Sequence, residues 1–166
     1  EIIILIQLNL KSLNGNVITN SMLLLKKLLS GIWKKMINFC TYFDKNYLSR
    51  FLTLESSLNR FNFSYTFFVL CLDDFVFNFF KKNNFENIKV ISLNDLEDEY
   101  SNLSGAKRNR DLIEYYFTLS PFLPKYLFEK FQISQLSYLD SDFYFFKNPI
   151  KKIEDNLNFS IVLIKQ

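Results

Sequence analysis

Four short apolar runs follow Met36, and they restrict the fold more than any other feature of the sequence. The runs occupy 37–43, 65–72, 87–93 and 136–139. Their β-branched and aromatic residues are typical of strands, and near-continuous apolar runs indicate strands that are buried on both faces. Segments with helical spacing lie between them. This alternation predicts an α/β fold with a mainly parallel sheet and flanking helices.

Helix signals occur between and after these runs. Helices are expected over 48–58, 73–82, 94–98 and 107–131, followed by a short helical turn in 148–158 and a fifth strand at 159–164. Asp73 is expected to cap the second helix and not to bind a metal. Pro121 and Pro124 are expected to break the long segment 107–131 or to begin a new first turn within it.

The chain is expected to form one domain over 36–166, preceded by an N-terminal extension at 1–35. Within the extension, 22–35 has the pattern of a basic amphipathic helix. Such a helix can attach weakly to a membrane surface. We favour an ordinary surface helix or sequence upstream of the true start. The run 2–10 is too short to span a bilayer and lacks the features of a signal peptide.

The composition excludes several classes of function. The sequence has no histidine, which excludes His-based acid–base catalysis and His-ligated metals within this chain. A net charge of +3 is too small to indicate nucleic-acid binding. Cys40 and Cys71 lie inside apolar runs, where buried free thiols are expected. Two such cysteines fit a reducing compartment, so we expect a cytoplasmic protein, with weak association at the inner face of the membrane as an option.

Asp140 and Asp142 form the most informative pair in the sequence. They follow the run 136–139 and precede an aromatic run that ends at Pro149. If 136–139 is a strand, alternation directs both carboxylates to the same side at its exit. Converging carboxylates repel each other, and a hard cation such as Mg²⁺ or Mn²⁺ relieves this repulsion. We expect a metal site here. The alternative is a polar turn in which Asp142 caps the next segment.

Three residues at the end of the first strand are candidate ligand contacts. At Thr41, Tyr42 and Asp44, backbone groups and one acid can hold a nucleoside. Asp44 can equally well cap the next helix. Because parallel strands place ligand sites at their carboxyl ends, these residues are expected near Asp140.

A local basic cluster lies ahead of the long apolar helix. It consists of Lys107, Arg108 and Arg110. These side chains can neutralise a diphosphate, and arginine offers a two-pronged donor for it. For any one of them, a solvated helix start is the plainer interpretation.

Three motifs in order resemble a known group of enzymes. They are NFCTYFDKNYL at 38–48 followed by LESSL at 54–58, EYYFTLSP at 114–121, and YLDSD at 138–142. Together they resemble bacterial nucleotide-sugar glycosyltransferases with the GT-A fold, a group that is similar to the family 8 transferases. The resemblance covers 36–166.

The resemblance implies a GT-A, Rossmann-like sheet and transfer of a sugar from a nucleotide diphosphate to an acceptor. It implies Mn²⁺ or Mg²⁺ on Asp140 and Asp142. The expected nucleotide-sugar contacts are Thr41, Tyr42, Asp44, Arg110, Asp140 and Ser141. Relatives in this group continue past 159–164 into an acceptor-binding half that often carries a histidine ligand. The domain is therefore expected to be incomplete at its C-terminus.

Three other functions share parts of this pattern. A nucleotidyltransferase of the same fold needs a Gly-rich phosphate loop after the first strand, and 43–46 contains no glycine. A phosphatase that uses Asp-x-Asp as nucleophile and acid carries the motif after the first strand, whereas three strands precede it here. The third alternative is an inactive fragment that binds nucleotide and transfers nothing.

Overall fold

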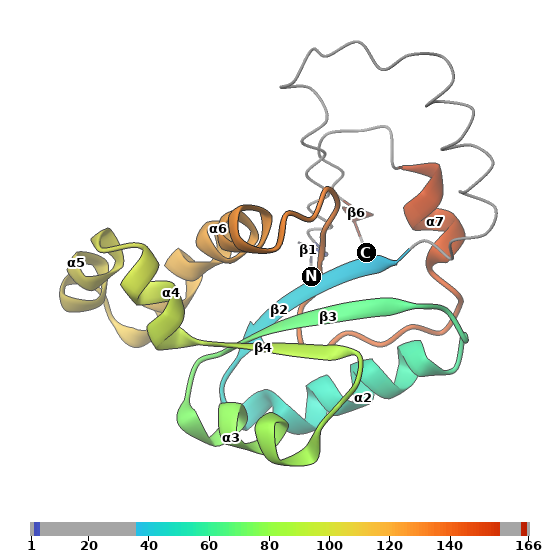
Figure 1. Ribbon diagram of the computed structural model, residues 1–166, viewed down its shortest axis with the longest axis horizontal. Helices are drawn as coiled ribbons and strands as arrows, with labels where there is room; N and C mark the ends of the chain where they lie inside the picture. The colour runs from blue at the N-terminus through green and yellow to red at the C-terminus, as the bar shows by residue number, and fades with distance from the viewer. Residues whose placement is uncertain (1, 4–35, 157–163, 166) are drawn as a thin grey trace, which may run out of the picture.

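The computed structural model describes residues 2–3, 36–156 and 164–165. Within this part, a parallel sheet lies between two layers of helices (Figure 1). The sheet contains β2 (Ile37–Phe43), β3 (Tyr65–Cys71), β4 (Ile88–Ser92) and β5 (Ser137–Tyr138). The predicted α/β class and parallel sheet are confirmed.

The strand order in this sheet is β4-β3-β2-β5, and every neighbouring pair is parallel. The chain builds outward from β2 to β4, and then crosses back to place β5 on the other side of β2. β5 is short, and it pairs with β2 only through Phe39↔Ser137 and Cys40↔Tyr138. The strand order therefore reverses between the neighbours β2 and β5. In such folds, ligand sites usually lie at this switch point, at the carboxyl ends of the strands.

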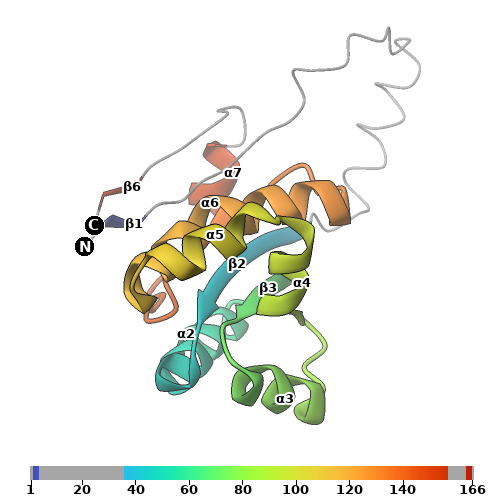
Figure 2. The same ribbon diagram turned by 90° about the vertical axis from the view of Figure 1, so that its left-hand side faces the viewer.

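Helices cover both faces of the sheet. α2 (Leu48–Asn59) and α3 (Asp74–Asn83) lie on one face, and α4 (Leu93–Glu99), α5 (Asn102–Asn109) and α6 (Leu112–Phe131) lie on the other (Figure 2). A single 3₁₀ turn, η2 (Lys45–Tyr47), links β2 to α2, and α7 (Ile150–Asp155) follows the loop after β5. The predicted helix over 73–82 is confirmed, and Asp73 caps it by accepting from the Val76 backbone N–H at 2.8 Å.

Strand alternation divides the core into two clusters. Phe39 and Phe43 of β2 pack with Phe51 of α2 on one face, while Cys40 packs with Leu119 of α6 on the other. Burial of such side chains stabilises the fold by roughly 1.5–3 kcal/mol each. Both faces of β2 are therefore covered, as its near-continuous apolar sequence predicts.

A buried carboxylate of α2 links this helix to the amino-terminal ends of β3 and β4. Glu55 of α2 is buried and accepts hydrogen bonds from Tyr65 Oη at 3.2 Å and Asn87 Nδ2 at 3.2 Å. Asn59 Nδ2 donates to the same carboxylate at 2.5 Å. These bonds satisfy a group that would be costly to bury without partners.

The predicted break at Pro121 and Pro124 is wrong. α6 runs through both prolines, and the division of 107–131 falls instead between α5 and α6, at Arg110 and Asp111. The reason is a capping box: the Asp111 side chain accepts from the Glu114 backbone N–H at 2.8 Å, and Glu114 accepts in turn from the Asp111 backbone N–H at 3.3 Å. The capping box explains where α6 begins, and the buried contacts of Leu119, Leu123 and Leu127 support the helix on both sides of the prolines.

Several predictions concern residues that the structure does not describe. The proposed amphipathic helix at 22–35 and most of the fifth strand at 159–164 lie outside the described residues. The described ends of the chain form a separate pair, in which β1 (Ile2–Ile3) runs antiparallel to β6 (Ile164–Lys165). None of the helices in the described part combines the length and apolar character needed to cross a membrane.

Candidate functional site

A cavity of about 990 Å³ lies at the carboxyl ends of the central strands. Its floor is formed by the residues that end β2 and β5, and its walls by the first turns of α6 and by the loop 140–146. The size suits a nucleotide or a similar organic ligand. It opens where β5 returns to the sheet, as expected for a parallel α/β fold.

Both acids of the Asp-x-Asp motif line this cavity. Asp140 and Asp142 are exposed, while Ser141 between them is buried and also lines the cavity. The route to this arrangement differs from the predicted one. β5 ends at Tyr138, and the acids lie in a turn closed by the Phe143 backbone N–H donating to the Asp140 carbonyl at 3.2 Å. The turn, and not strand alternation, brings both acids to the cavity.

Asp44 both caps a helix and lines the cavity. Its carboxylate accepts from the Asn46 backbone N–H and from Asn46 Nδ2, each at 3.0 Å, at the start of η2. The same side chain is half-buried in the cavity wall. The two interpretations left open by the sequence are therefore compatible.

Tyr42 and Thr41 are placed differently. Tyr42 lines the cavity, and its hydroxyl lies 2.9 Å from the Ser120 hydroxyl of α6. Thr41 is fully buried and is not among the cavity-lining residues. Among the described residues, its hydroxyl has no hydrogen-bond partner. Any contact of Thr41 with a ligand would therefore use its backbone or need a shift of the strand.

The basic cluster lies beside the cavity and not in its wall. The Arg110 guanidinium donates to the Thr118 hydroxyl of α6. Lys107 forms an ion pair with Glu97 of α4 at 2.7 Å. Arg108 is exposed on α5. Within the described part of the chain, no lysine or arginine side chain lines the cavity.

Arg50 is a cation near the site that sequence reasoning missed. Its guanidinium Nη1 lies 3.5 Å from Asp142 Oδ2, and the group stacks over the Tyr47 ring at 4.6 Å. Both partners line the cavity. No sequence signal links Arg50 to Asp142, because the two are far apart in the chain and only the fold brings α2 to the loop after β5.

The donor set fits a hard divalent cation in part. Asp140 and Asp142 present carboxylate oxygens at the same wall, which is the ligand chemistry of Mg²⁺ and Mn²⁺. Among the described residues, no group of three or more His, Cys, Asp or Glu side chains is arranged to hold a metal. Two carboxylates suit Mg²⁺, which is commonly bound through one or two acids together with substrate phosphates.

The pKa values of two cavity tyrosines are raised chiefly by burial and secondarily by nearby acids. Burial, Tyr42 and Asp140 raise the pKa of Tyr138 above its ordinary value. Burial, Asp44 and Asp73 raise the pKa of Tyr116. Both phenols therefore stay neutral at physiological pH and can donate or accept hydrogen bonds. The same negative field favours a cation at this wall.

Exposed apolar side chains gather around the cavity mouth. Of the nine large apolar residues that are exposed in the described part, six line this cavity. We call these six the apolar rim: Tyr47, Leu112, Ile113, Phe117, Tyr144 and Phe146. Phe117 is 70% exposed and Phe146 84%. Exposed apolar patches of this kind mark interaction sites. The rim could not be predicted from the sequence, because its members come from three separate segments.

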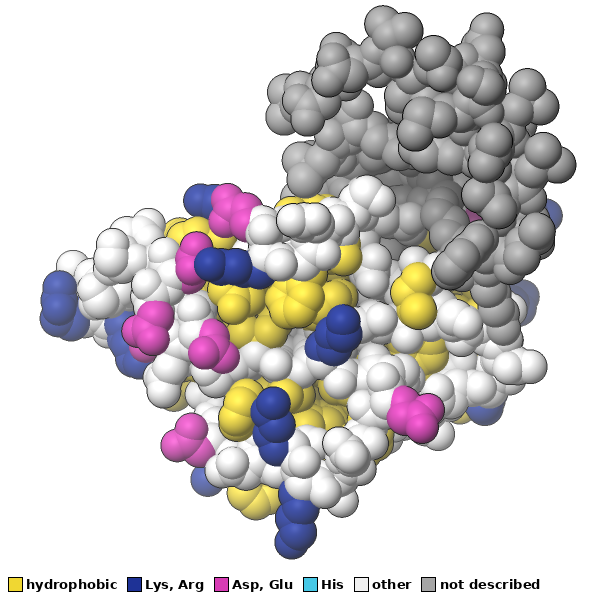
Figure 3. Space-filling model, viewed as in Figure 1, with side chains coloured by type: hydrophobic (Ala, Val, Ile, Leu, Met, Phe, Trp, Pro, Cys, Tyr) yellow, Lys and Arg dark blue, Asp and Glu magenta, His cyan; other side chains and the backbone are white. Residues whose placement is uncertain are grey.

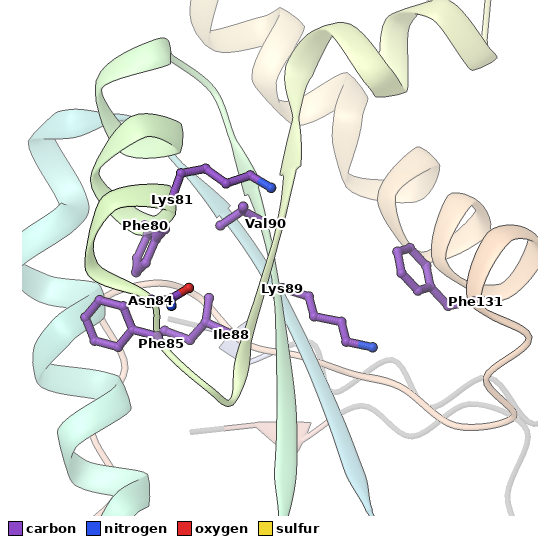
Figure 4. A pocket seen from close by; sticks show the side chains of 8 residues that line it. All are labelled: Phe80, Lys81, Asn84, Phe85, Ile88, Lys89, Val90 and Phe131. Atoms are coloured by element: carbon purple, nitrogen blue, oxygen red, sulfur yellow. The ribbon is translucent and has the colours of Figure 1, made fainter.

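A second, smaller cavity of about 340 Å³ lies at β4. Figure 4 shows Lys89 and Phe131 on one side of this strand and Phe80 and Phe85 on the other. It is lined by two lysines, Asn84 and apolar residues, and no carboxylate of the described residues contributes to it. On the face shown in Figure 3, Lys and Arg side chains are scattered among acidic and apolar ones and do not form a continuous patch.

Comparisons with known proteins give distant relatives only. The chain is similar to the uncharacterized protein YfnF of Bacillus subtilis strain 168, with 27% identity over 126 residues, or 75% of this chain and 41% of the relative. It is also similar to the uncharacterized protein YfnD of the same organism, with 24% identity over 127 residues, or 76% of this chain and 40% of the relative. The matched region thus spans about two fifths of each relative. No protein-family model and no solved structure matches the chain.

Proposed function

We propose that this chain is the nucleotide-sugar-binding part of a metal-dependent glycosyltransferase with the GT-A fold. One observation carries the proposal: acids that follow two adjacent strands, Asp44 after β2 and the Asp140–Asp142 pair after the edge strand β5, line a single cavity. The parallel sheet and the reversal of the chain between β2 and β5 support it. The activity of the whole protein is part of the proposal.

In this proposal, Asp140 and Asp142 hold Mn²⁺ or Mg²⁺ at the cavity wall. A bound ion would take up negative charge from the nucleotide diphosphate as the sugar leaves. Asp44 and Tyr42 line the place for the nucleoside, and Ser141 supplies a polar group beside the metal ligands. Arg110 remains a proposed diphosphate contact, and it would have to leave Thr118 to reach the cavity.

The nucleotidyltransferase alternative is less well supported. Its Gly-rich phosphate loop would follow β2, but that position is occupied by η2, which Asp44 caps and which contains no glycine. The helical turn there directs a carboxylate towards the cavity, which opposes phosphate binding at the same point. The inactive nucleotide-binding fragment differs from our proposal in activity alone, so an experiment must distinguish the two.

Calorimetric titration tests the donor site. UDP and a panel of nucleotide sugars are titrated into the purified chain, with and without Mn²⁺. We expect binding that requires Mn²⁺ and is lost in Asp140→Asn/Asp142→Asn. Asp98→Asn, which changes an exposed acid on α4 away from the cavity, is the control and should bind normally.

Absence of binding by the folded wild-type chain would contradict the proposed donor site. Binding that is equally strong without metal and in the double variant would contradict the metal role. A separate assay then follows release of UDP from the nucleotide sugar that binds. Tight, metal-dependent binding without any release would favour the inactive fragment over the transferase.

A further inference from the structure

The loop that carries Asp142 is held by side chains of α2. The Ser57 hydroxyl accepts a hydrogen bond from the Phe145 backbone N–H at 3.1 Å. Arg60 Nη2 donates to the Phe145 backbone carbonyl at 2.7 Å. Both backbone polar groups of one loop residue are therefore bound by side chains from the C-terminal end of a distant helix.

The two α2 groups are themselves fixed. Ser57 is buried, and its hydroxyl donates to the Leu54 carbonyl at 2.6 Å, which leaves its lone pairs for Phe145. The Arg60 guanidinium also lies over the Tyr144 ring at 5.1 Å. The oriented Ser57 hydroxyl and the Arg60 guanidinium together fix the position and orientation of the loop backbone at Phe145.

Because successive side chains of the loop 143–146 point in alternate directions, fixing the Phe145 backbone also orients the side chains that line the cavity. The rings of Phe143 and Phe145 meet edge to face, with centroids 4.8 Å apart, and pack on the core cluster between the sheet and α2; Phe143 also lines the cavity. Tyr144 and Phe146 also pair at 4.8 Å, and both belong to the apolar rim. When the Phe145 backbone is held, its neighbours on either side are directed to the cavity.

We propose that Ser57 and Arg60 are positioning residues of the cavity. By binding both backbone groups of Phe145, they set the placement of Asp142 and Tyr144 in the cavity wall. Arg50 extends this support along α2, since it contacts Asp142 directly. The effect on nucleotide binding rests on the proposed function, whereas the effect on the loop does not.

Hydrogen exchange and calorimetry on the same variants test this role. The variants are Ser57→Ala, Arg60→Gln and Arg60→Lys. The controls are Thr53→Ala, which removes an exposed hydroxyl bonded only to its own helix in the structure, and Arg108→Gln on α5. Arg60 is exposed, so Arg60→Gln keeps the test valid if the buried Ser57→Ala variant fails to fold.

We expect amide exchange over 142–146 to become about five- to tenfold faster in Ser57→Ala and Arg60→Gln, as loss of one hydrogen bond predicts. Exchange in β2 and β3 should not change. Mn²⁺-dependent UDP binding should weaken by about the same factor. Arg60→Lys, which keeps a donor for the carbonyl, should recover part of both effects, and the controls should match the wild type.

Unchanged exchange over 142–146 would overturn the inference. Faster exchange with unchanged UDP affinity would also overturn it, because Ser57 and Arg60 would then be structural only. If the wild-type chain binds no nucleotide, the proposed function fails. The positioning role is then decided by the exchange data and by the side-chain carboxyl chemical shift of Asp142, which should move in Arg60→Gln and stay unchanged in Arg108→Gln.

Discussion

At the scale of single residues, Cys71 shows how burial at a strand end changes a functional group. It is the last residue of β3, it is almost fully buried, and it lies inside the apolar run 65–72, where a buried free thiol was predicted. Burial raises the pKa of the Cys71 thiol to about 12, and the nearby Asp73 adds to the effect. The thiol is therefore inert as a nucleophile near neutral pH.

This shift predicts a pH dependence of stability. The folded-state pKa lies above the ordinary value of 9.0, so the contribution of Cys71 is complete below pH 9 and is lost as pH rises from 9 towards 12. The loss is about 1.4 kcal/mol per pH unit for one such group. Urea unfolding at pH 8 to 11 should show a shallower decline in Cys71→Ala than in the wild type. Equal slopes would show that the thiol ionises as easily in the folded state as in the unfolded one.

The sequence located the acids of the site but not their surroundings. Asp44, Asp140 and Asp142 could be found because each follows an apolar run, and strand ends meet at one edge of a parallel sheet. Arg50 could not be found, because its contact with Asp142 depends on how α2 packs. The burial of Thr41 could not be predicted either: its side chain is fully buried, so the predicted ligand contact is left to its backbone.

At the scale of elements, strands were easier to predict than helix ends. β2 has the predicted bounds, Ile37–Phe43, because all its residues except Asn38 are apolar or β-prone and a helix cap follows directly. α6 was mispredicted because two prolines were given more weight than the capping box at Asp111. Helix starts depend on a few hydrogen bonds that composition does not reveal.

The prolines of α6 give a second prediction. Pro121 is exposed and interrupts the helix hydrogen bonds, whereas Pro124 is buried. Pro121→Ala should raise the free energy of unfolding by about 1–2 kcal/mol, less than the full helix propensity difference because alanine also loosens the unfolded chain. Pro124→Ala should raise the free energy of unfolding by less, since this substitution also removes buried contacts. Urea unfolding of both variants provides the measurement, and a destabilised Pro121→Ala would contradict the expectation.

At the scale of the whole molecule, the apolar rim forms an exposed hydrophobic surface at the cavity mouth. Side chains from η2, α6 and the loop after β5 together surround the cavity mouth and remain exposed. This surface is expected to bind apolar dyes and to limit solubility of the isolated chain.

The rim prediction can be checked with a double substitution. Phe117→Ser/Phe146→Ser should reduce binding of an apolar fluorescent dye at least twofold, and should change stability by no more than about 0.5 kcal/mol, since both side chains are mostly exposed. Phe75→Ser removes a phenylalanine that is 59% exposed and lies outside the cavity, and should leave dye binding unchanged. Equal loss of dye binding in both variants would mean that the rim is not a distinct patch.

The short pairing of β5 with β2 also has a kinetic consequence. β2, β3 and β4 are neighbours in both sequence and space, so they can assemble early, whereas β5 must return from far along the chain to form only two paired positions. The cavity is complete only after β5 has paired with β2, because Asp44 follows β2 and Asp140 follows β5. A ligand that contacts both acids would therefore stabilise the product of the last folding step. It would slow the dissociation of β5 from β2 more than it would speed the assembly of β2, β3 and β4.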